Sequence, residues 1–249
     1  MTSSLWVIIP AAGVGQRMQS HCPKQYLSLA GQTILDRTID IFISHVSVAG
    51  VLVGVGEHDA YWPDSKWYQH DRVHRFTGGK ERCDTVQKGL EYLLSGFGVT
   101  QQDVLVHDAA RPLLSPAALK RIIDHRSDQG AILAMPVKET VKRQVAEQNA
   151  VDITLDRSTI WLAQTPQKFP AQALLTALQT AQMQGITVTD ECSAMEFVGW
   201  HPDLVIGESS NIKITLPEDL LIAEALFSFL SSSGVLSPSS FNLNNECVS

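Results

Sequence analysis

The sequence predicts an α/β protein, built as a mainly parallel twisted sheet flanked by helices, with a β-hairpin arm that projects from it. Short apolar runs alternate with segments of helical periodicity along most of the chain, which is the pattern of repeated βα units. One later stretch alternates apolar and polar residues instead, which is typical of a hairpin. The 249 residues, 44% of them hydrophobic, are enough for a large buried core.

The first third of the chain predicts three strands and one helix. Leu5–Pro10 (LWVIIP) has the composition of a buried strand and leads into a loop that contains two glycines. Thr33–Ile43 places apolar residues at helical spacing. Gly50–Gly56 and Val73–Thr77 are the next two predicted strands, and the second of them ends at a pair of glycines.

The middle of the chain continues the βα order. A helix is predicted over Glu81–Leu94 and a strand over Asp103–His107. Pro116 fits the first turn of a further helix, which we expect to end near Gly130. Ala131–Val137 then predicts another strand.

The βα order is interrupted after that strand. Thr140–Val145 and Val151–Asp156 both alternate in polarity, and the polar stretch AEQNA joins them, which predicts a two-stranded hairpin. An isolated hairpin is only marginally stable in water. We therefore expect this arm, about residues 138–158, to pack against a second subunit.

The last part of the chain predicts helices over residues 170–183, 190–197 and 217–230, and strands over 203–207 and 211–215. Residues 1–230 are treated as a single domain. The remaining 19 residues, 231–249, are rich in Ser and Asn, and we expect them to form a disordered tail.

Charge and hydropathy narrow the classes of partner. With 19 Lys and Arg against 26 Asp and Glu, the formal charge is −7, which disfavours non-specific binding to nucleic acid or to an anionic membrane. The apolar runs are far shorter than the roughly 20 residues of a membrane span. Because no Lys or Arg precedes the first apolar run, we expect a cytoplasmic rather than a secreted protein.

The cysteines predict neither a metal site nor a disulfide framework. They lie far apart, with no C-x-x-C spacing among them, at Cys22, Cys83, Cys192 and Cys247. We expect reduced cytosolic thiols.

The first loop carries the strongest signal for chemistry. The run AAGVG follows the first strand, and Arg17 and Lys24 add positive charge in a segment, residues 1–35, that contains no Asp or Glu. Glycines let the backbone approach a phosphate and direct N–H groups at it. The loop matches neither the P-loop nor the full G-x-G-x-x-G pattern. It therefore predicts an anion site of another type, or, as the alternative, a glycine turn beside two solvated cations.

Several motifs in the chain together resemble one enzyme family. The run PAAGVGQRM, followed by PKQY, is similar to the start of the sugar-nucleotide pyrophosphorylase-like nucleotidyltransferases. The later motifs are GGKER at 78–82, HDAARP at 107–112, TPQ at 165–167, TDE at 189–191 and NIKIT at 211–215. With these, the chain resembles the 2-C-methyl-D-erythritol 4-phosphate cytidylyltransferases from about residue 5 to residue 230.

The resemblance implies a Rossmann-like fold whose β-arm is exchanged in a homodimer. It also implies transfer of CMP from CTP to a sugar-alcohol phosphate, with release of pyrophosphate, in non-mevalonate isoprenoid synthesis. The acceptor phosphate would attack the α-phosphorus in line, so the enzyme must chiefly position two anions and stabilise the charge of the transition state. Mg²⁺ is implied as well, held mainly by the CTP phosphates.

Matching the motifs residue by residue implies individual roles. Arg17 and Lys24 resemble the pair that stabilises the transition state at the α-phosphate, and Arg157 and Lys213 resemble the pair that positions the attacking phosphate. The residues that would contact the nucleotide are Ala11, Ala12, Gly13, Gly15, Gly79, Thr85 and Asp108. Those that would line the acceptor site are Asp108, Ala109, Thr140, Arg157 and Lys213.

Two positions depart from the family pattern. Lys80 stands where an acidic residue is common, which leaves open how that side chain takes part in base recognition. Thr85 stands where Ser is common, and the hydroxyl is retained.

Without the resemblance, several of these residues have simpler interpretations. Arg157 follows Asp156 and could form a surface ion pair, and Lys213 could protect a sheet edge. Lys80-Glu81-Arg82 and Asp190-Glu191 would be polar helix starts, the first solvated and the second capped. Two other functions also stay open: a ribitol 5-phosphate cytidylyltransferase, and a non-catalytic nucleotide-binding module on the same fold.

Overall fold

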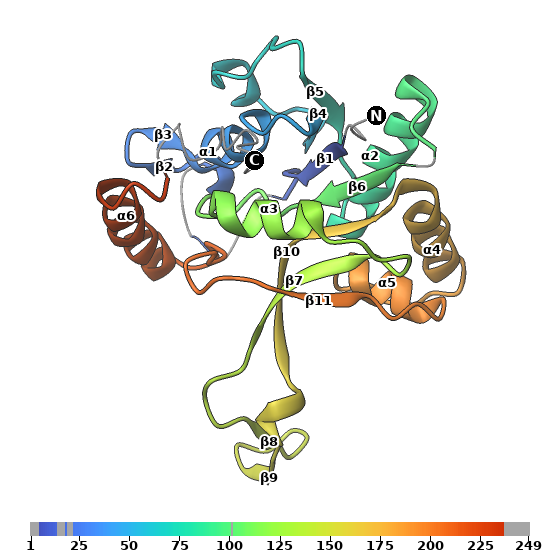
Figure 1. The fold of residues 1–249 in the computed structure, drawn as a ribbon, viewed down its shortest axis with the longest axis vertical. Helices are drawn as coiled ribbons and strands as arrows, with labels where there is room; N and C mark the ends of the chain where they lie inside the picture. Colours follow the sequence, from blue (N-terminus) through green and yellow to red (C-terminus); the bar gives the residue numbers. More distant parts are fainter. Residues whose placement is uncertain (1–4, 14–17, 19–21, 101, 237–249) are drawn as a thin grey trace, which may run out of the picture.

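The protein is described here by a computed structural model that covers residues 5–13, 18, 22–100 and 102–236. Its centre is a sheet of seven strands in the order β11-β7-β10-β6-β1-β4-β5 (Figure 1). The strands are β1 (Leu5–Pro10), β4 (Val48–Val55), β5 (Val73–Thr77), β6 (Asp103–Val106), β7 (Ala131–Pro136), β10 (Trp161–Pro170) and β11 (Asp203–Ile206). Only β10 runs antiparallel to its neighbours. The predicted mainly parallel α/β fold is confirmed.

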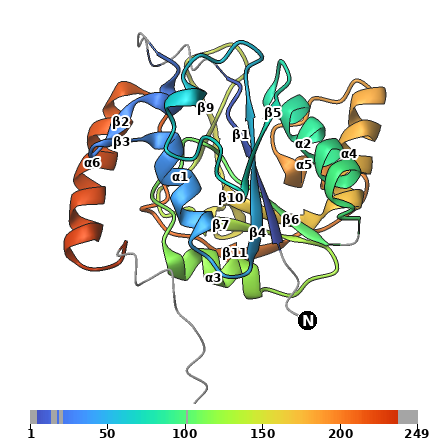
Figure 2. The same cartoon turned by 90° about the horizontal axis from the view of Figure 1, so that it is seen from above.

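Helices cover both faces of the sheet (Figure 2). On one face lie α1 (Ile34–Ile43) and α3 (Pro116–Asp124), with α6 (Pro217–Ser232) outside them near the short strands β2 (Ser28–Leu29) and β3 (Gln32–Thr33). On the other face lie α2 (Arg82–Phe97), α4 (Ala171–Met183) and α5 (Glu191–Phe197). The short 3-10 turns are Lys24–Tyr26, Trp62–Asp64 and Arg157–Thr159.

The side chains of β1 show how the layers are held together. Val7 and Ile9 point into the apolar cluster under α1 and α3, whereas Trp6 and Ile8 point into the cluster under α2 and α4. All four are buried. A parallel strand covered on both faces must be apolar at every position, which is why LWVIIP is a continuous apolar run.

Local side chains determine where several helices begin. The Thr33 hydroxyl accepts a hydrogen bond from a backbone N–H in the first turn of α1, and Ser115 does the same for α3, where Pro116 occupies the first helical position. Asp190 and Ser193 form a reciprocal capping box at the start of α5. The predicted capped helix start at Asp190 is confirmed.

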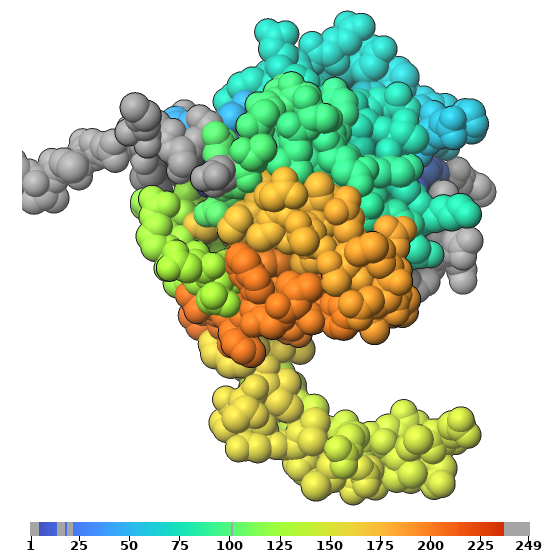
Figure 3. All heavy atoms as spheres, turned by 90° about the vertical axis from the view of Figure 1, so that its right-hand side faces the viewer, coloured from blue at the N-terminus to red at the C-terminus, as the bar shows by residue number. Residues whose placement is uncertain are grey.

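The predicted arm is present and stands clear of the body of the protein (Figures 1 and 3). Its tip is the antiparallel pair β8 (Lys142–Gln144) and β9 (Val151–Thr154), and all residues of these two strands are exposed. At its base, the ladder of β7 and β10 continues through a hydrogen bond from the Val137 N–H to the Ile160 carbonyl, at 3.0 Å. The arm is thus inserted between two neighbouring strands of the main sheet.

The tail expected over residues 231–249 begins inside α6, which extends to Ser232, and residues 237–249 lie outside the described part of the chain. Three other elements differ from the prediction. The helix expected to reach Gly130 ends at Asp124, because His125 is extended and the Lys168 ammonium donates to the carbonyls of Ile123 and His125. Residues 211–215 form no strand. The Ile214 N–H donates to a loop carbonyl, that of Ala110, rather than to a sheet ladder.

The third difference is β10, which the sequence analysis missed. Its central residues are buried and it contains prolines at 166 and 170, so it shows neither alternation nor a clean apolar run.

The described part of the chain also bears on the cysteines and on membrane spans. Cys83 and Cys192 are free thiols, and no helix there is long and apolar enough to cross a membrane.

Candidate active site

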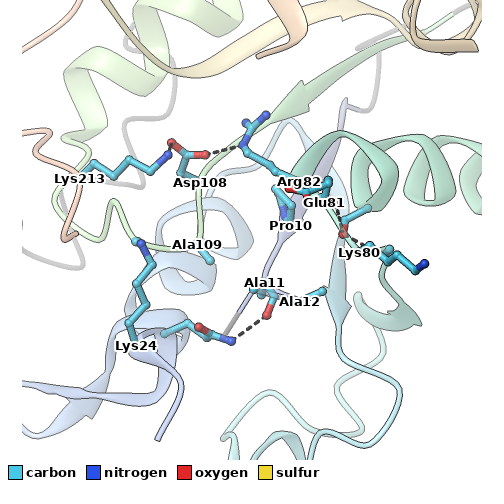
Figure 4. Close-up of a pocket in the computed structure, with 15 residues that line it drawn as sticks. Pro10, Ala11, Ala12, Lys24, Lys80, Glu81, Arg82, Asp108, Ala109 and Lys213 are labelled. Atoms are coloured by element: carbon cyan, nitrogen blue, oxygen red, sulfur yellow. Dashed lines mark hydrogen bonds and ion pairs between the residues drawn. The ribbon is translucent and has the colours of Figure 1, made fainter. Parts of the chain in front are cut away.

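A cavity of about 310 Å³ opens at the carboxyl ends of the parallel strands, where open α/β sheets bind their ligands (Figure 4). It is formed by the loop after β1, the loop between β5 and α2, and the segments that follow β6 and precede α6. The predicted site residues that line it are Ala11, Ala12, Gly13, Lys24, Gly79, Thr85, Asp108, Ala109 and Lys213.

The PKQY motif anchors Ala11, the first residue after β1. The buried Gln25 amide donates a 2.7 Å hydrogen bond to the Ala11 carbonyl, and the Ala11 N–H donates to the Gly54 carbonyl at the end of β4. Sequence reasoning gave no role to Gln25. Its position beside Lys24 in a short 3-10 turn means that one turn supplies both the support for the loop and a cation for the cavity.

Lys24 is brought close to a segment from the far end of the chain. Its ammonium donates a 3.0 Å hydrogen bond to the carbonyl of Ile214, the residue after Lys213. In Figure 4 the two lysines enter the cavity from the same side. The predicted cation of the first motif and that of the last motif therefore line the same cavity.

The glycine pair after β5 allows two loops to approach each other. A Cβ at Gly78 would lie 2.5 Å from the Ala12 Cβ, and a Cβ at Gly79 would lie 2.3 Å from that of Asp84. The Gly79 N–H donates to the Thr85 hydroxyl at 2.9 Å, and this hydroxyl donates in turn to the Glu81 carbonyl at 3.1 Å. These two hydrogen bonds of the Thr85 hydroxyl thus shape the loop that borders the cavity.

Asp108 is the centre of charge in the site. Its Oδ1 accepts a hydrogen bond from Arg82 Nε at 2.8 Å, and its Oδ2 lies 3.0 Å from Lys213 Nζ and 3.3 Å from Arg111 Nε. Burial alone would raise the pKa of Asp108, but the three cations outweigh burial and hold this pKa well below its usual range. Asp108 is therefore a carboxylate throughout the physiological pH range.

Arg82 is not the solvated helix residue that the sequence suggested. Besides Asp108, it binds Glu191, with NH1 2.6 Å from Oε1 and NH2 3.0 Å from Oε2. Burial would lower the pKa of Arg82, but the two carboxylates raise it above its ordinary value. The interpretation of the GGKER arginine as a solvated residue is wrong, because the buried acids that accept its hydrogen bonds come from distant parts of the chain.

A second polar layer lies behind Asp108. The Thr165 hydroxyl accepts a hydrogen bond from the Asp108 N–H at 3.1 Å and lies 3.0 Å from His107 Nδ1. His107 Nε2 lies 3.0 Å from the Arg111 carbonyl, which can only accept, so the proton is on Nε2. Burial lowers the pKa of His107 to about 4. This histidine is a neutral structural link rather than a base.

Asn211 joins this layer to the last motif. Its side-chain amide nitrogen donates to the Thr165 backbone carbonyl at 2.9 Å, and its backbone carbonyl accepts from Arg111 NH1 at 2.6 Å. The TPQ, HDAARP and NIKIT motifs are therefore in direct contact.

Two of the predicted residues do not line this cavity. Thr140 and Arg157 lie on the exposed arm, and the Arg157 guanidinium donates to the Lys138 carbonyl of the same arm. Arg17 and Gly15 lie outside the described residues. Among the described residues, the single chain thus brings together those predicted for the nucleotide and Lys213, but not the two arm residues predicted for the acceptor.

The comparisons with known proteins agree with the motifs. A family model described as 2-C-methyl-D-erythritol 4-phosphate cytidylyltransferase matches residues 5–228. A protein of that name from Pseudomonas paraeruginosa is 46% identical over 227 residues, which cover 90% of this chain and 96% of the relative. One from Vibrio parahaemolyticus is 46% identical over 224 residues, covering 89% and 94%.

A solved structure supports the same assignment. The crystal structure of the Francisella tularensis 2-C-methyl-D-erythritol 4-phosphate cytidylyltransferase superposes with a TM-score of 0.77 at 36% identity, covering 90% of this chain and all of that one. The family model, the sequence relatives and this fold agree over nearly the same residues. The chain therefore belongs to the 2-C-methyl-D-erythritol 4-phosphate cytidylyltransferase family, and is a nucleotidyltransferase.

Proposed function

We propose that the protein transfers CMP from CTP to 2-C-methyl-D-erythritol 4-phosphate in the cytoplasm. The products are 4-CDP-2-C-methyl-D-erythritol and pyrophosphate, in the non-mevalonate route to isoprenoid precursors. The observation that carries the proposal is the convergence of Lys24, Lys213 and Asp108 in one cavity at the carboxyl ends of β1 and β6. Membership of the family gives the donor and the acceptor.

The reaction is one in-line displacement. An oxygen of the acceptor phosphate forms a bond to the α-phosphorus of CTP, while the bond from that phosphorus to the bridging oxygen of the β-phosphate breaks and its electron pair leaves with pyrophosphate. A phosphate monoester is largely ionised near neutral pH, so no general base is needed. His107, neutral and bonded on both ring nitrogens, has no part in proton transfer.

The cations supply the catalysis. Lys24, with Arg17, stabilises the charge that builds up on the α-phosphate in the transition state, and Lys213, with Arg157, positions the attacking phosphate. Asp108 holds the Lys213 ammonium at 3.0 Å and so orients it before the substrates bind. The backbone of Ala11, Ala12 and Gly13 borders the space for the triphosphate.

The divalent cation of the reaction is Mg²⁺, bound mainly to the triphosphate. Among the described residues there is no group of three or more His, Cys, Asp or Glu side chains that could hold a metal ion. Asp108, a carboxylate in the cavity, already faces three protein cations. These residues fit an ion that keeps most of its ligands from phosphate and water, as Mg²⁺ does. When bound, it neutralises charge on the phosphates and favours departure of pyrophosphate.

The second half of the acceptor site comes from a partner subunit in a homodimer. Thr140 and Arg157 are not among the residues that line the cavity, and they lie on an arm that projects from the body of its own chain (Figure 3). The arm and its base expose large apolar side chains, with Val151 62%, Ile153 48% and Leu162 60% accessible. An exposed apolar surface on a projecting element is typical of a contact with another chain.

Pyrophosphate release from CTP tests the function. We expect turnover with Mg²⁺ and 2-C-methyl-D-erythritol 4-phosphate, and poor use of ATP, GTP and UTP. Ribitol 5-phosphate is the matched second acceptor, because it carries the same terminal phosphate on a different polyol. Turnover with ribitol 5-phosphate alone would show that the protein is a ribitol 5-phosphate cytidylyltransferase instead. CTP binding without turnover on either acceptor would indicate a non-catalytic nucleotide-binding module.

A further inference from the structure

Glu191 is a buried carboxylate that the mechanism above does not use. It is the first residue of α5, its side chain is 1% exposed, and it is not among the residues that line the cavity. Burying an unpaired carboxylate is costly, so its partner matters. That partner is Arg82, the first residue of α2, which binds both Glu191 oxygens at 2.6 and 3.0 Å.

The bidentate pair fixes the direction of the third Arg82 donor. A guanidinium is planar, so once NH1 and NH2 are held by the two oxygens of Glu191, the orientation of Nε is set. Nε donates to Asp108 Oδ1 at 2.8 Å. Figure 4 shows Arg82 and Lys213 reaching Asp108 from opposite sides.

The orientation of Asp108 decides what Lys213 can bind. With Oδ1 taken by Arg82, Oδ2 faces Lys213 Nζ at 3.0 Å, and Arg111 Nε lies 3.3 Å from the same oxygen. A guanidinium that was not held by a second acid would be able to bind both Asp108 oxygens, because that is the preferred geometry of an arginine and a carboxylate. It would then compete directly with Lys213.

We propose that Glu191 is a positioning residue for the transfer reaction. By holding Arg82 in a bidentate pair, it leaves Asp108 Oδ2 available to Lys213. The Lys213 ammonium is thereby kept where the attacking phosphate has to be bound. This inference rests on the proposed function, since that function gives Lys213 its role toward the acceptor.

The test is the Glu191→Gln variant, which keeps the size of the side chain and removes its charge. We expect kcat/KM for 2-C-methyl-D-erythritol 4-phosphate to fall about 10- to 100-fold, the usual effect of losing a residue that orients a functional group. The Kd of CTP, measured without acceptor, should change less than about 3-fold. The matched control is Glu196→Gln on the exposed side of the same helix, whose activity should stay at the wild-type level.

A double-mutant cycle separates positioning from a general structural role. If Glu191 acts through Lys213, Glu191→Gln should cost less than about 3-fold in a Lys213→Ala background, because the group it positions is already gone. An equal loss in both backgrounds would overturn the proposal. So would a matching loss of CTP affinity, or a Glu191→Gln enzyme as active as the control.

A crystal structure of the Glu191→Gln variant gives a readout that needs no turnover. We expect Arg82 to rotate onto both oxygens of Asp108 and the Lys213 ammonium to leave Oδ2. An unchanged Arg82, Asp108 and Lys213 arrangement would overturn the proposal even if wild-type turnover were normal. If the wild-type protein showed no turnover, but the Glu191→Gln structure showed the expected movement of Arg82 and Lys213, only the proposed function would be contradicted.

Discussion

Lys213 Nζ lies 3.0 Å from Asp108 Oδ2, although the two residues come from motifs in different halves of the chain. Because Arg82 and Arg111 also contact Asp108, one carboxylate faces three cations at the edge of the cavity, and only Arg82 has a second acid, Glu191, beside it. Its negative charge is therefore needed both to hold Lys213 and to keep the arginines buried.

Asp108→Asn should destabilise the fold. The variant leaves Arg82 and Arg111, whose side chains are 26% and 12% exposed, without this counter-charge. Removing one partner of a buried ion pair costs about 3 kcal/mol. We expect a loss of that order in the free energy of unfolding, measured by urea denaturation at pH 7. The control is Asp152→Asn, which breaks an exposed pair with Arg143 and should cost less than about 1 kcal/mol. Equal effects would show that the Asp108 cluster adds no stability.

Lys24→Ala should lower the rate of chemistry rather than the affinity for CTP. We expect kcat to fall by about 10²- to 10³-fold, the usual effect of losing one group that stabilises transition-state charge. Arg17→Ala should behave in the same way. Steady-state kinetics with CTP as the varied substrate measures both constants. Lys66→Ala, which removes a surface cation paired with Asp40, is the control for charge alone. A raised KM with an unchanged kcat would assign Lys24 to ground-state binding.

Gly78→Ala should close the space between the loops after β1 and β5. The new methyl group would lie 2.5 Å from the Ala12 Cβ, so the two loops must separate. We expect CTP affinity to fall at least about 10-fold, measured by calorimetry. At Gly56 and Gly13 a Cβ meets no atom within 4 Å among the residues that the structure describes. Gly56→Ala should therefore be silent, whereas Gly13→Ala should lose CTP affinity without losing thermal stability, because Gly13 lines the cavity proposed for the nucleotide and Gly56 does not. Normal CTP binding by Gly78→Ala would show that the loops adapt.

A mixture of Arg157→Ala and Lys24→Ala proteins should recover activity that neither has alone. If the arm completes the partner's site, one site of each mixed dimer contains wild-type residues at both positions. Native mass spectrometry on isotope-labelled proteins first establishes that subunits exchange, and pyrophosphate release then measures recovery. Complete exchange without recovery would show that Arg157 serves the site of its own chain.

Stability should depend on pH between about 6.5 and 4 because of His107. Burial lowers the pKa of His107 to about 4, so in this range the unfolded chain takes up a proton that the folded protein does not. Unfolding is then favoured as the pH falls, by on the order of 3 kcal/mol over the whole interval. Denaturant titrations at several pH values should show a shallower dependence in His107→Gln, and an unchanged one in the exposed His201→Gln control. Identical slopes in all three proteins would show that His107 titrates normally.

Much of the fold could be predicted from the sequence because it depends on local patterns. The apolar run of β1, the cap at Thr33 and the capping box at Asp190 each need only neighbouring residues. The strand β10 could not be predicted, since its sequence contains two prolines and shows neither alternation nor a clean apolar run, and it is ordered by pairing with β6 and β7. The same holds for residues 211–215, whose backbone bonds to a loop.

The residues of the site also fall into those that the sequence could predict and those that it could not. The glycines and lysines could be identified because motifs with a fixed spacing contain them. The role of Arg82 could not, because an arginine in a helix start is solvated unless buried acids face it, and Glu191 lies in a helix 109 positions later. Tertiary burial, not local sequence, distinguishes the two cases.

The arm leaves the sheet between β7 and β10, and the hydrogen bond from Val137 to Ile160 already joins the two chain segments at its base. A short turn could bridge these segments, since adjacent antiparallel strands need only a few residues to connect them. The sheet and its helices can thus fold without the arm, and the arm serves to complete the acceptor site. A shortened protein without residues 139–158 should be a folded monomer that still binds CTP, so that subunit association can be removed without rebuilding the nucleotide half of the enzyme.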